Sequence, residues 1–277
     1  MADEDELRWD LAGPLTAIEA DVEAALAGLP HDPVELCRAA QGLVMLPDLA
    51  PAFGLPDDRQ EERAIRSASA VLRRALELDP SPVGAARAAP HRVIGTCRHF
   101  ALLSCAFLRH RSIPARARCG FASYFEPELH VDHWITEYRA DDGRWIRIDP
   151  EILGFDVVEH PEDLAPGAFL TGGEAWTLIR EGGADPESFG VAGTDHAWGI
   201  AEVRGNAIRD LASLNKVEAL PWDEWGGMRS SYEGTSGPSF DALIDDVAAA
   251  CASADPDVVR ALYESDDLRV PHTLLGS

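Results

Sequence analysis

A helix-like run followed by three strand-like runs, all between residues 97 and 148, constrains the fold of this chain more than any other feature. Residues 97–111 carry apolar side chains at helical spacing, and Thr96 is placed to cap the first turn. Runs rich in β-branched and aromatic residues follow at 115–125, 131–138 and 144–148. A helix that precedes a meander of strands is typical of an α+β fold, so we predict a helix packed on an antiparallel sheet.

The segments on either side of this region have different patterns. Residues 1–90 have apolar residues three and four positions apart, which predicts helices at 15–29, 34–46 and 61–78. Residues 156–277 mix loops rich in Gly and Pro with helical stretches. We therefore expect a helical N-terminal subdomain at 1–90, a central core at 91–155, and a C-terminal extension at 156–277 that packs on the core.

Charge and hydropathy exclude several classes of partner. The chain has 277 residues and a net charge of −24, which repels nucleic acid phosphates and anionic lipid surfaces. Apolar stretches such as 101–108 are far shorter than the roughly 20 residues that span a bilayer. We expect no nucleic acid and no membrane partner, and the oligomeric state is left unassigned.

The N-terminus and the cysteines suggest a compartment. Residues 1–6 are acidic where a secretory signal is basic and then apolar, so no signal peptide is expected. The five cysteines are odd in number, widely spaced and without a Cys-x-x-Cys pair. This pattern indicates free thiols in a reducing, cytoplasmic environment, with neither a metal nor a cofactor.

Cys97 opens the predicted helix at 97–111. A helix N-terminus has unsatisfied N–H groups and a partial positive charge, which favour a thiolate. With an imidazolium nearby, such a position lowers a cysteine pKa from about 8.5 into the range of roughly 3.5 to 7.5. Cys97 is therefore the candidate nucleophile, while Cys105, two turns further along the helix, is expected to pack in the core.

His133 and Asp149 fall on two strand-like runs joined by a turn, and they are the types that serve a thiol as base and orienting acid. In an antiparallel hairpin, two residues share a face only when their numbers have an even sum, and 133 + 149 = 282. A five-residue connection at 139–143 would place them directly opposite, and a three-residue loop at 141–143 would place them diagonally. We therefore predict a loop of odd length or a compensating bulge.

Several local motifs combine into a family resemblance. They are Gly95-Thr-Cys97, Ile113-Pro-Ala-Arg116, Asp132-His133-Trp134 and Trp145-Ile-Arg-Ile-Asp149-Pro150. Together, over about residues 92–152, they resemble the transglutaminase-like superfamily of cysteine enzymes. The resemblance implies a papain-like core, with Cys97 as nucleophile, His133 as base and Asp149 as orienting acid. It also implies acyl transfer through a thioester to water or an amine.

Other residues near these motifs have two open interpretations. Arg98, His99 and Trp134 are candidate substrate or oxyanion contacts, although His99 is equally suited to capping or packing. Asp132 is expected on the opposite strand face from His133, as a solvated residue. In the C-terminal extension, Trp222, Asp223 and Trp225 either line a substrate pocket or build the core.

These residues predict a cysteine-dependent hydrolase or acyltransferase acting on an amide or thioester bond of a small molecule or peptide. Hydrolysis is slightly favoured, because water is always available as the acceptor. An amide-forming acyltransferase is the first alternative, and the basic run 109–118 is the one dense patch for docking an acidic carrier. The alternative from another class is a metal- or partner-binding module in which His130, Asp132 and His133 hold an ion.

Overall fold

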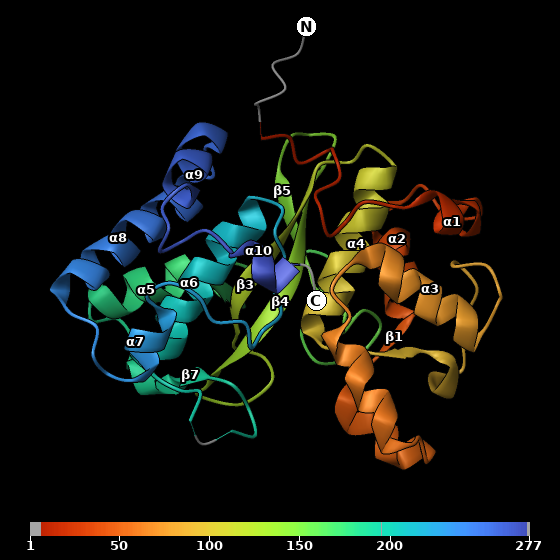
Figure 1. The fold of residues 1–277 in the computed structure, drawn as a ribbon, viewed down its shortest axis with the longest axis horizontal. Coiled ribbons are helices and arrows are strands. Elements are labelled where there is room, and N and C mark those ends of the chain that lie inside the picture. Colours follow the sequence, from red (N-terminus) through yellow and green to blue (C-terminus); the bar gives the residue numbers. More distant parts are fainter. Residues whose placement is uncertain (1–6, 195, 276–277) are drawn as a thin grey trace, which may run out of the picture.

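The computed structural model describes residues 7–194 and 196–275. The expectation about a signal peptide rests on residues 1–6 and lies outside the described residues. Figure 1 shows a sheet in the middle of the molecule, with the N-terminal helices and α4 on one side and helices α5 to α9 on the other. None of the described helices combines the length and the apolarity that crossing a bilayer requires.

The predicted helix and meander form the centre of this arrangement. Helix α4 spans Cys97–His110, and the antiparallel strands β3, β4 and β5 span Ala115–Ala122, His130–Arg139 and Trp145–Ile148. Helix α4 packs on β3 and β4 through a core that includes Phe107 and Trp134. The predicted α+β fold, with the Cys97 helix packed on an antiparallel sheet, is confirmed.

The sheet contains two short strands that the sequence did not predict. Strand β6 (Phe169–Thr171) extends the order to β5-β4-β3-β6, and β7 (Phe189–Gly190) pairs in parallel with β4. Gly120 on β3 faces His133 on one side and Thr171 on the other. A Cβ atom at Gly120 would lie 2.0 Å from the Leu170 carbonyl oxygen, so only glycine allows β6 to approach.

The N-terminal segment is less helical than predicted. The expected helix at 15–29 is reduced to α1 (Ala20–Glu23) and a 3-10 turn, because Ser69 donates to Ala17 O and accepts from the Glu19 N–H. Those backbone groups are thus satisfied by a side chain rather than by a helix.

The other two N-terminal helices are shorter than predicted. Helix α2 spans Pro33–Gln41, and α3 spans Ala68–Leu78 behind a Ser67 cap. Residues 44–45, which belong to the predicted helix at 34–46 but lie beyond α2, form β1 (Val44–Met45). This strand pairs in parallel with β2 (Val93–Ile94). Strands of two residues are too short for a periodic pattern to identify.

The C-terminal segment covers the other side of the sheet. Its helices are α5 (Gly172–Arg180), α6 (Ile200–Leu214), α7 (Met228–Tyr232), α8 (Pro238–Ser253), α9 (Pro256–Tyr263) and α10 (His272–Leu275). Helix α6 packs on β3 and forms an apolar core with α5 and α8. The N-terminal segment shares a separate core with α4. The domain boundaries at 90 and 155 stay predictions.

A buried ion cluster joins β3, β4 and α6. Arg118 contacts Asp210 of α6 at 2.8 Å and Glu137 of β4 at 2.8 Å, and Arg116 contacts Glu137 at 2.6 Å. Burial opposes ionisation of Glu137, but the arginines hold its pKa well below the usual range. Arg109 is also fully buried, 3.0 Å from Glu218. The run 109–118 is therefore largely interior, and its prediction as a docking patch is wrong.

Glu137→Ala is expected to lower the free energy of unfolding by about 3–5 kcal/mol, because Arg116 and Arg118 would be buried without their carboxylate. Urea unfolding of both proteins measures this loss. Glu126→Ala, at an exposed position, is the matched control. A change below about 1 kcal/mol for Glu137→Ala would contradict the role given to the cluster.

Candidate active site

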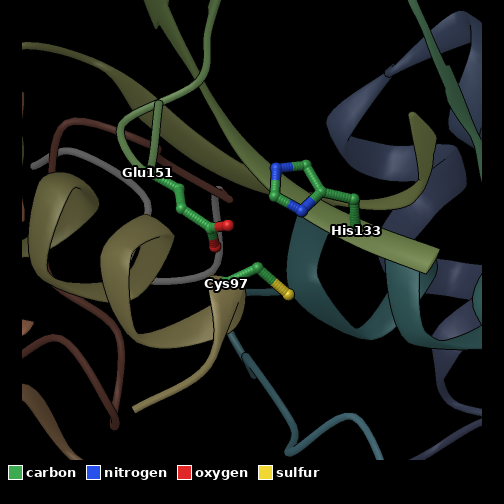
Figure 2. Close-up of side chains that lie close together, drawn as sticks. All are labelled: Cys97, His133 and Glu151. Carbon is green, nitrogen blue, oxygen red and sulfur yellow. The ribbon is translucent and has the colours of Figure 1, made fainter. Parts of the chain in front are cut away.

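Cys97, His133 and Asp149 meet at the end of the sheet that faces the start of α4. Cys97 is the first residue of α4, His133 lies on β4, and Asp149 directly follows β5. His133 Nε2 lies 2.8 Å from Asp149 Oδ2. The Cys97 sulfur lies within 4.8 Å of the nearest His133 ring nitrogen, and Figure 2 shows a ring nitrogen turned toward the sulfur. The structure brings together all three residues that the sequence proposed as catalytic.

The hairpin between β4 and β5 explains why His133 and Asp149 share a face. The paired residues, from Thr136↔Ile148 to Arg139↔Trp145, have a constant sum: 136 + 148 = 284. The Ala140 N–H then donates to Arg144 O at 2.9 Å, which leaves a three-residue loop at 141–143. The loop is of odd length, as predicted, and the diagonal alternative is the one observed.

Asp149 is fixed in place by donors on both carboxylate oxygens. The Tyr124 hydroxyl donates to Oδ2 at 2.5 Å, and the Glu151 backbone N–H donates to Oδ1 at 3.0 Å. Burial and the nearby Asp149 carboxylate raise the pKa of Tyr124, so the hydroxyl keeps the proton that it donates. Asp149 is fully buried and therefore has a fixed orientation toward the His133 ring.

The charge on the Cys97 and His133 pair depends on burial and on Asp149. Burial opposes a charged imidazole, but the Asp149 carboxylate raises the pKa of His133 well above its usual range. Loss of water around the sulfur raises the pKa of Cys97, and the hydrogen bond with His133 acts in the opposite direction. The lowered pKa expected for Cys97 from the helix start is wrong, because burial of the sulfur was not part of that expectation.

Glu151 is a fourth member of the site that the sequence argument missed. One carboxylate oxygen lies within 4.8 Å of the Cys97 sulfur and of a His133 nitrogen, and Figure 2 shows the three groups converging. Burial raises the pKa of Glu151 to about 7, with a smaller opposing effect from His133. The register of the hairpin would have identified this residue. Paired residues of β4 and β5 have numbers that add up to 284, and 133 + 151 = 284, so extending the pairing past Ile148 places Glu151 opposite His133.

The candidates next to the catalytic motifs have structural roles. Arg98 is fully buried and donates to Glu218 O, while His99 lies between the Thr96 N–H (3.1 Å) and Ile65 O (2.9 Å). Trp134 is fully buried in the core shared with α4. His99 thus caps the helix start and packs in the interior, as one of its two interpretations predicted. None of these three side chains reaches the site. Their prediction as substrate contacts fails because each points into the interior.

Of the three C-terminal candidates, two are buried and one is exposed. Asp223 is buried in an ion pair with Arg66 at 2.6 Å, and Trp225 is buried and donates to Leu268 O at 2.9 Å. Trp222 is 47% exposed and lines a cavity together with Asp132. Only Trp222 is therefore placed to contact a substrate, and the core-building alternative describes Trp225.

The metal module built from His130, Asp132 and His133 does not match the structure. His130 stacks on Phe189, Asp132 accepts a hydrogen bond from Asn206 Nδ2 at 2.6 Å, and His133 contacts Asp149. Side chains alternate along β4, so His133 points to the opposite face from His130 and Asp132, and those two contact different partners. Asp132 is not a solvated residue as expected: burial and the Glu202 carboxylate raise its pKa to about 6.

One cavity borders the site at Glu151, and a second lies at Asp132, the residue before His133 on β4. One, of about 530 Å³, is lined by Glu151, by Phe125, and by apolar side chains including Leu49, Phe53 and Phe155. The ring of Phe125 also packs edge-on against His133, 5.0 Å away. The other cavity, of about 430 Å³, is lined by Asp132, Glu202, Arg209 and Trp222 among others. The first, apolar cavity is lined mainly by apolar side chains, and the second, acidic cavity also carries three carboxylates, those of Asp132, Glu202 and Glu224.

One comparison with known proteins supports a cysteine-dependent enzyme. Residues 50–150, less than half of the chain, match the family model of the transglutaminase-like superfamily, which confirms the resemblance. A solved structure of a candidate cysteine protease from Cytophaga hutchinsonii is similar at a TM-score of 0.36 and 17% identity. The similarity covers 58% of this chain and 46% of that one, and it supports no conclusion about activity. No curated protein matches the chain.

Asp149→Asn is expected to slow iodoacetamide labelling of Cys97 at pH 6 to 7 by about tenfold or more. Losing the carboxylate lowers the pKa of His133, and each unit shifts the pair tenfold from thiolate and imidazolium toward the neutral forms. Mass spectrometry resolves Cys97, the one cysteine residue that is partly exposed, from the four buried ones.

The exposed Asp156→Asn variant is the matched control, and it should label at the rate of the unmodified protein. Equal labelling of Asp149→Asn and the unmodified protein across the pH range would show that Asp149 does not set the charge of the pair.

Proposed function

Because residues 50–150 match the transglutaminase-like superfamily, we propose that this protein is a cysteine-dependent hydrolase or acyltransferase. Its substrate would be an amide or thioester bond of a small molecule or peptide, cleaved through a thioester to Cys97. One observation carries this proposal: the Cys97 sulfur faces a His133 ring whose far nitrogen lies 2.8 Å from a buried Asp149. The five free cysteines fit the proposed cytoplasmic location.

The proposed reaction has two steps. In the first, His133 takes the Cys97 proton, and the sulfur attacks the substrate carbonyl carbon. The new C–S bond replaces the bond to the leaving group, which receives the proton from His133. In the second, His133 takes a proton from water, the resulting oxygen attacks the thioester, and the thiol is regenerated as the acid leaves. Asp149 remains ionised and stabilises the imidazolium in both steps.

Backbone N–H groups at the start of α4 are the proposed oxyanion donors. The first turn of a helix has N–H groups without intrahelical partners, and Cys97 opens this one. The carbonyl attacked by the Cys97 sulfur lies over this helix end, where such donors stabilise a developing negative charge.

The apolar cavity is the proposed site for the acyl group. Its lining includes Glu151 and Phe125, which place it next to the Cys97 sulfur and the His133 ring. Its rim has exposed apolar side chains at Leu49, Phe53 and Phe155. An apolar acyl group would cover these side chains, and burying each methylene group contributes about 0.8 kcal/mol.

Amide formation is the second candidate function, and the acidic cavity favours it. Asp132 and Glu202 lie close enough for Glu202 to raise the pKa of Asp132. Arg209 lies 3.0 Å from Glu202 and pairs with that carboxylate. A cationic amine in this cavity would supply a second positive charge, which Asp132 could pair with. Docking of an acidic carrier has less support, because Arg109, Arg116 and Arg118 form internal ion pairs.

The unmodified protein is expected to form an acyl-enzyme on Cys97 when it is incubated with p-nitrophenyl esters. The value of kcat/KM should rise about fourfold per methylene group over short straight chains, because each group is buried in the apolar cavity. Mass spectrometry locates the acyl group, and p-nitrophenolate release gives the rate.

Cys97→Ser should abolish both signals, while Cys105→Ser, a buried thiol on the same helix, should retain them. Acylation of another residue in the Cys97→Ser variant at the original rate would refute the proposed function.

A primary diamine such as 1,5-diaminopentane is expected to compete with water for the acyl-enzyme if amide formation is the activity. Asp132→Asn should then lower the ratio of amide to acid about fivefold, because one attractive contact of about 1 kcal/mol is lost. Chromatography of the products measures this ratio. Methanol, an uncharged acceptor, is the control whose ratio should not change. No amide product from the unmodified protein would leave hydrolysis as the function.

A further inference from the structure

Three different ligand atoms converge in the active site. A carboxylate oxygen of Glu151, a ring nitrogen of His133 and the sulfur of Cys97 all lie within 4.8 Å of one another. Within residues 7–194 and 196–275, this is the one group of three or more His, Cys, Asp or Glu side chains with such a separation. Figure 2 shows the three side chains arriving from different directions: the start of α4, strand β4 and the segment after β5.

Glu151 has a binding capacity that the protein does not use. Its buried Oε2 atom has no hydrogen-bond partner among the described residues. A buried carboxylate oxygen without a donor costs free energy, which a bound ligand at this point would recover. The unpartnered carboxylate, aimed at the sulfur and the ring, is an observation independent of the proximity of the three residues.

The donor set selects zinc among the common divalent cations. Thiolate, imidazole and carboxylate together suit Zn²⁺, whereas Mg²⁺ and Ca²⁺ prefer oxygen ligands alone. One thiolate, one carboxylate and a neutral imidazole also balance the charge of a divalent ion. Three protein ligands leave one tetrahedral position open, and here that position would be taken by water.

The distances require little rearrangement. Zinc bonds of about 2.0–2.3 Å at tetrahedral angles give ligand separations of roughly 3.3–3.7 Å. The present separations, up to 4.8 Å, close to this range with about 1 Å of side-chain movement. The Glu151 side chain borders the apolar cavity, which leaves it room to move.

The groups around His133 are those that support a zinc ligand. Its Nε2 atom is bound to Asp149, which leaves the other ring nitrogen to the metal. Asp149 is in turn held by the Tyr124 hydroxyl and the Glu151 N–H. A histidine ligand whose second nitrogen donates to a carboxylate has a fixed orientation and greater basicity.

We propose that Cys97, His133 and Glu151 form a reversible zinc site that switches off the cysteine chemistry. The ion would occupy the Cys97 sulfur and the His133 nitrogen together, so neither could act on a substrate. Binding releases the proton shared by Cys97 and His133 and any proton on Glu151 to solvent, with no change of oxidation state. The inhibition rests on the proposed function, but the zinc site itself does not.

Competition with a chromogenic zinc chelator, in a buffer with a phosphine reductant, tests the site without any substrate. The unmodified protein should bind one Zn²⁺ per chain. Cys97→Ser and Glu151→Gln should each weaken binding at least about tenfold, because changes to zinc-site residues typically cost 10- to 100-fold in affinity. Glu159→Gln, the same substitution at an exposed position on the following segment, should bind as the unmodified protein does.

Thiol labelling provides a second readout. Zn²⁺ should slow iodoacetamide labelling of Cys97 in the unmodified protein, and Mg²⁺ at the same concentration should not. Loss of this protection in Glu151→Gln would support the three-residue site. Unfolding curves of each variant establish that the fold is intact, and Glu151→Leu provides a second removal of the ligand.

Two results would overturn the proposal: no stoichiometric Zn²⁺ on the unmodified protein, or equally tight binding by folded Glu151→Gln and Glu151→Leu variants. Both are distinct from failure of the proposed function. If no acyl-enzyme forms but zinc binds as described, the enzyme assignment fails and the site stands. If the acyl-enzyme forms and zinc does not bind, the reverse holds.

Discussion

The register of the β4–β5 hairpin is the constraint on which the site depends. Extended past its last pair, the sum of 284 makes His133 diagonal to Asp149 and opposite Glu151, and these side chains meet in the structure. A shift of one residue would move His133 away from both carboxylates. The loop at 141–143 fixes this register, and Gly143 has a φ of +86°, which favours glycine. A short turn about 6 to 10 residues along the chain from His133 and Asp149 thus specifies the geometry of the site.

Burial affects the charges in this site and opposes the effect expected of the helix start. The start of α4 supplies N–H groups and a partial positive charge, but loss of water around the Cys97 sulfur works against a thiolate. Asp149 compensates by favouring the imidazolium form of His133. The Tyr124 hydroxyl holds Asp149 in the position this requires. Reactivity of the cysteine is therefore a property of a chain of contacts rather than of a helix terminus alone.

Sequence patterns predicted the parts of the fold that are long and local. The α4 helix and strands β3, β4 and β5 have enough residues for a period to be visible, and their order places Cys97, His133 and Asp149 on known elements. Strands β1, β6 and β7 have two or three residues each, and contacts distant in sequence create them. Tertiary burial likewise decided that Arg98 points inward, toward Glu218 O.

The register of the β4–β5 hairpin is a feature that the sequence pattern only partly predicts. Parity alone placed His133 and Asp149 on one face, but it allowed loops of three or five residues. Those two loops give His133 different partners. In the five-residue loop paired residue numbers add up to 282, which pairs His133 with Asp149, and in the three-residue loop they add up to 284, which pairs it with Glu151. Glu151 became visible only when the turn was known. Its unpartnered Oε2 is a tertiary fact that no local pattern contains.

The paired strands β3 and β4 carry opposite kinds of polar group at their two ends. At one end, Arg116 and Arg118 meet Glu137 in a cluster of paired charges. At the other, His133 lies beside Glu151, whose Oε2 atom has no donor, and on the opposite face Asp132 accepts a hydrogen bond from the neutral Asn206 amide. A buried polar group costs free energy when it is incompletely paired, so a folded chain retains it where something else completes it. The paired end holds the sheet to α6, and the incompletely paired end is where substrate, acceptor or metal ion would contribute the missing contacts.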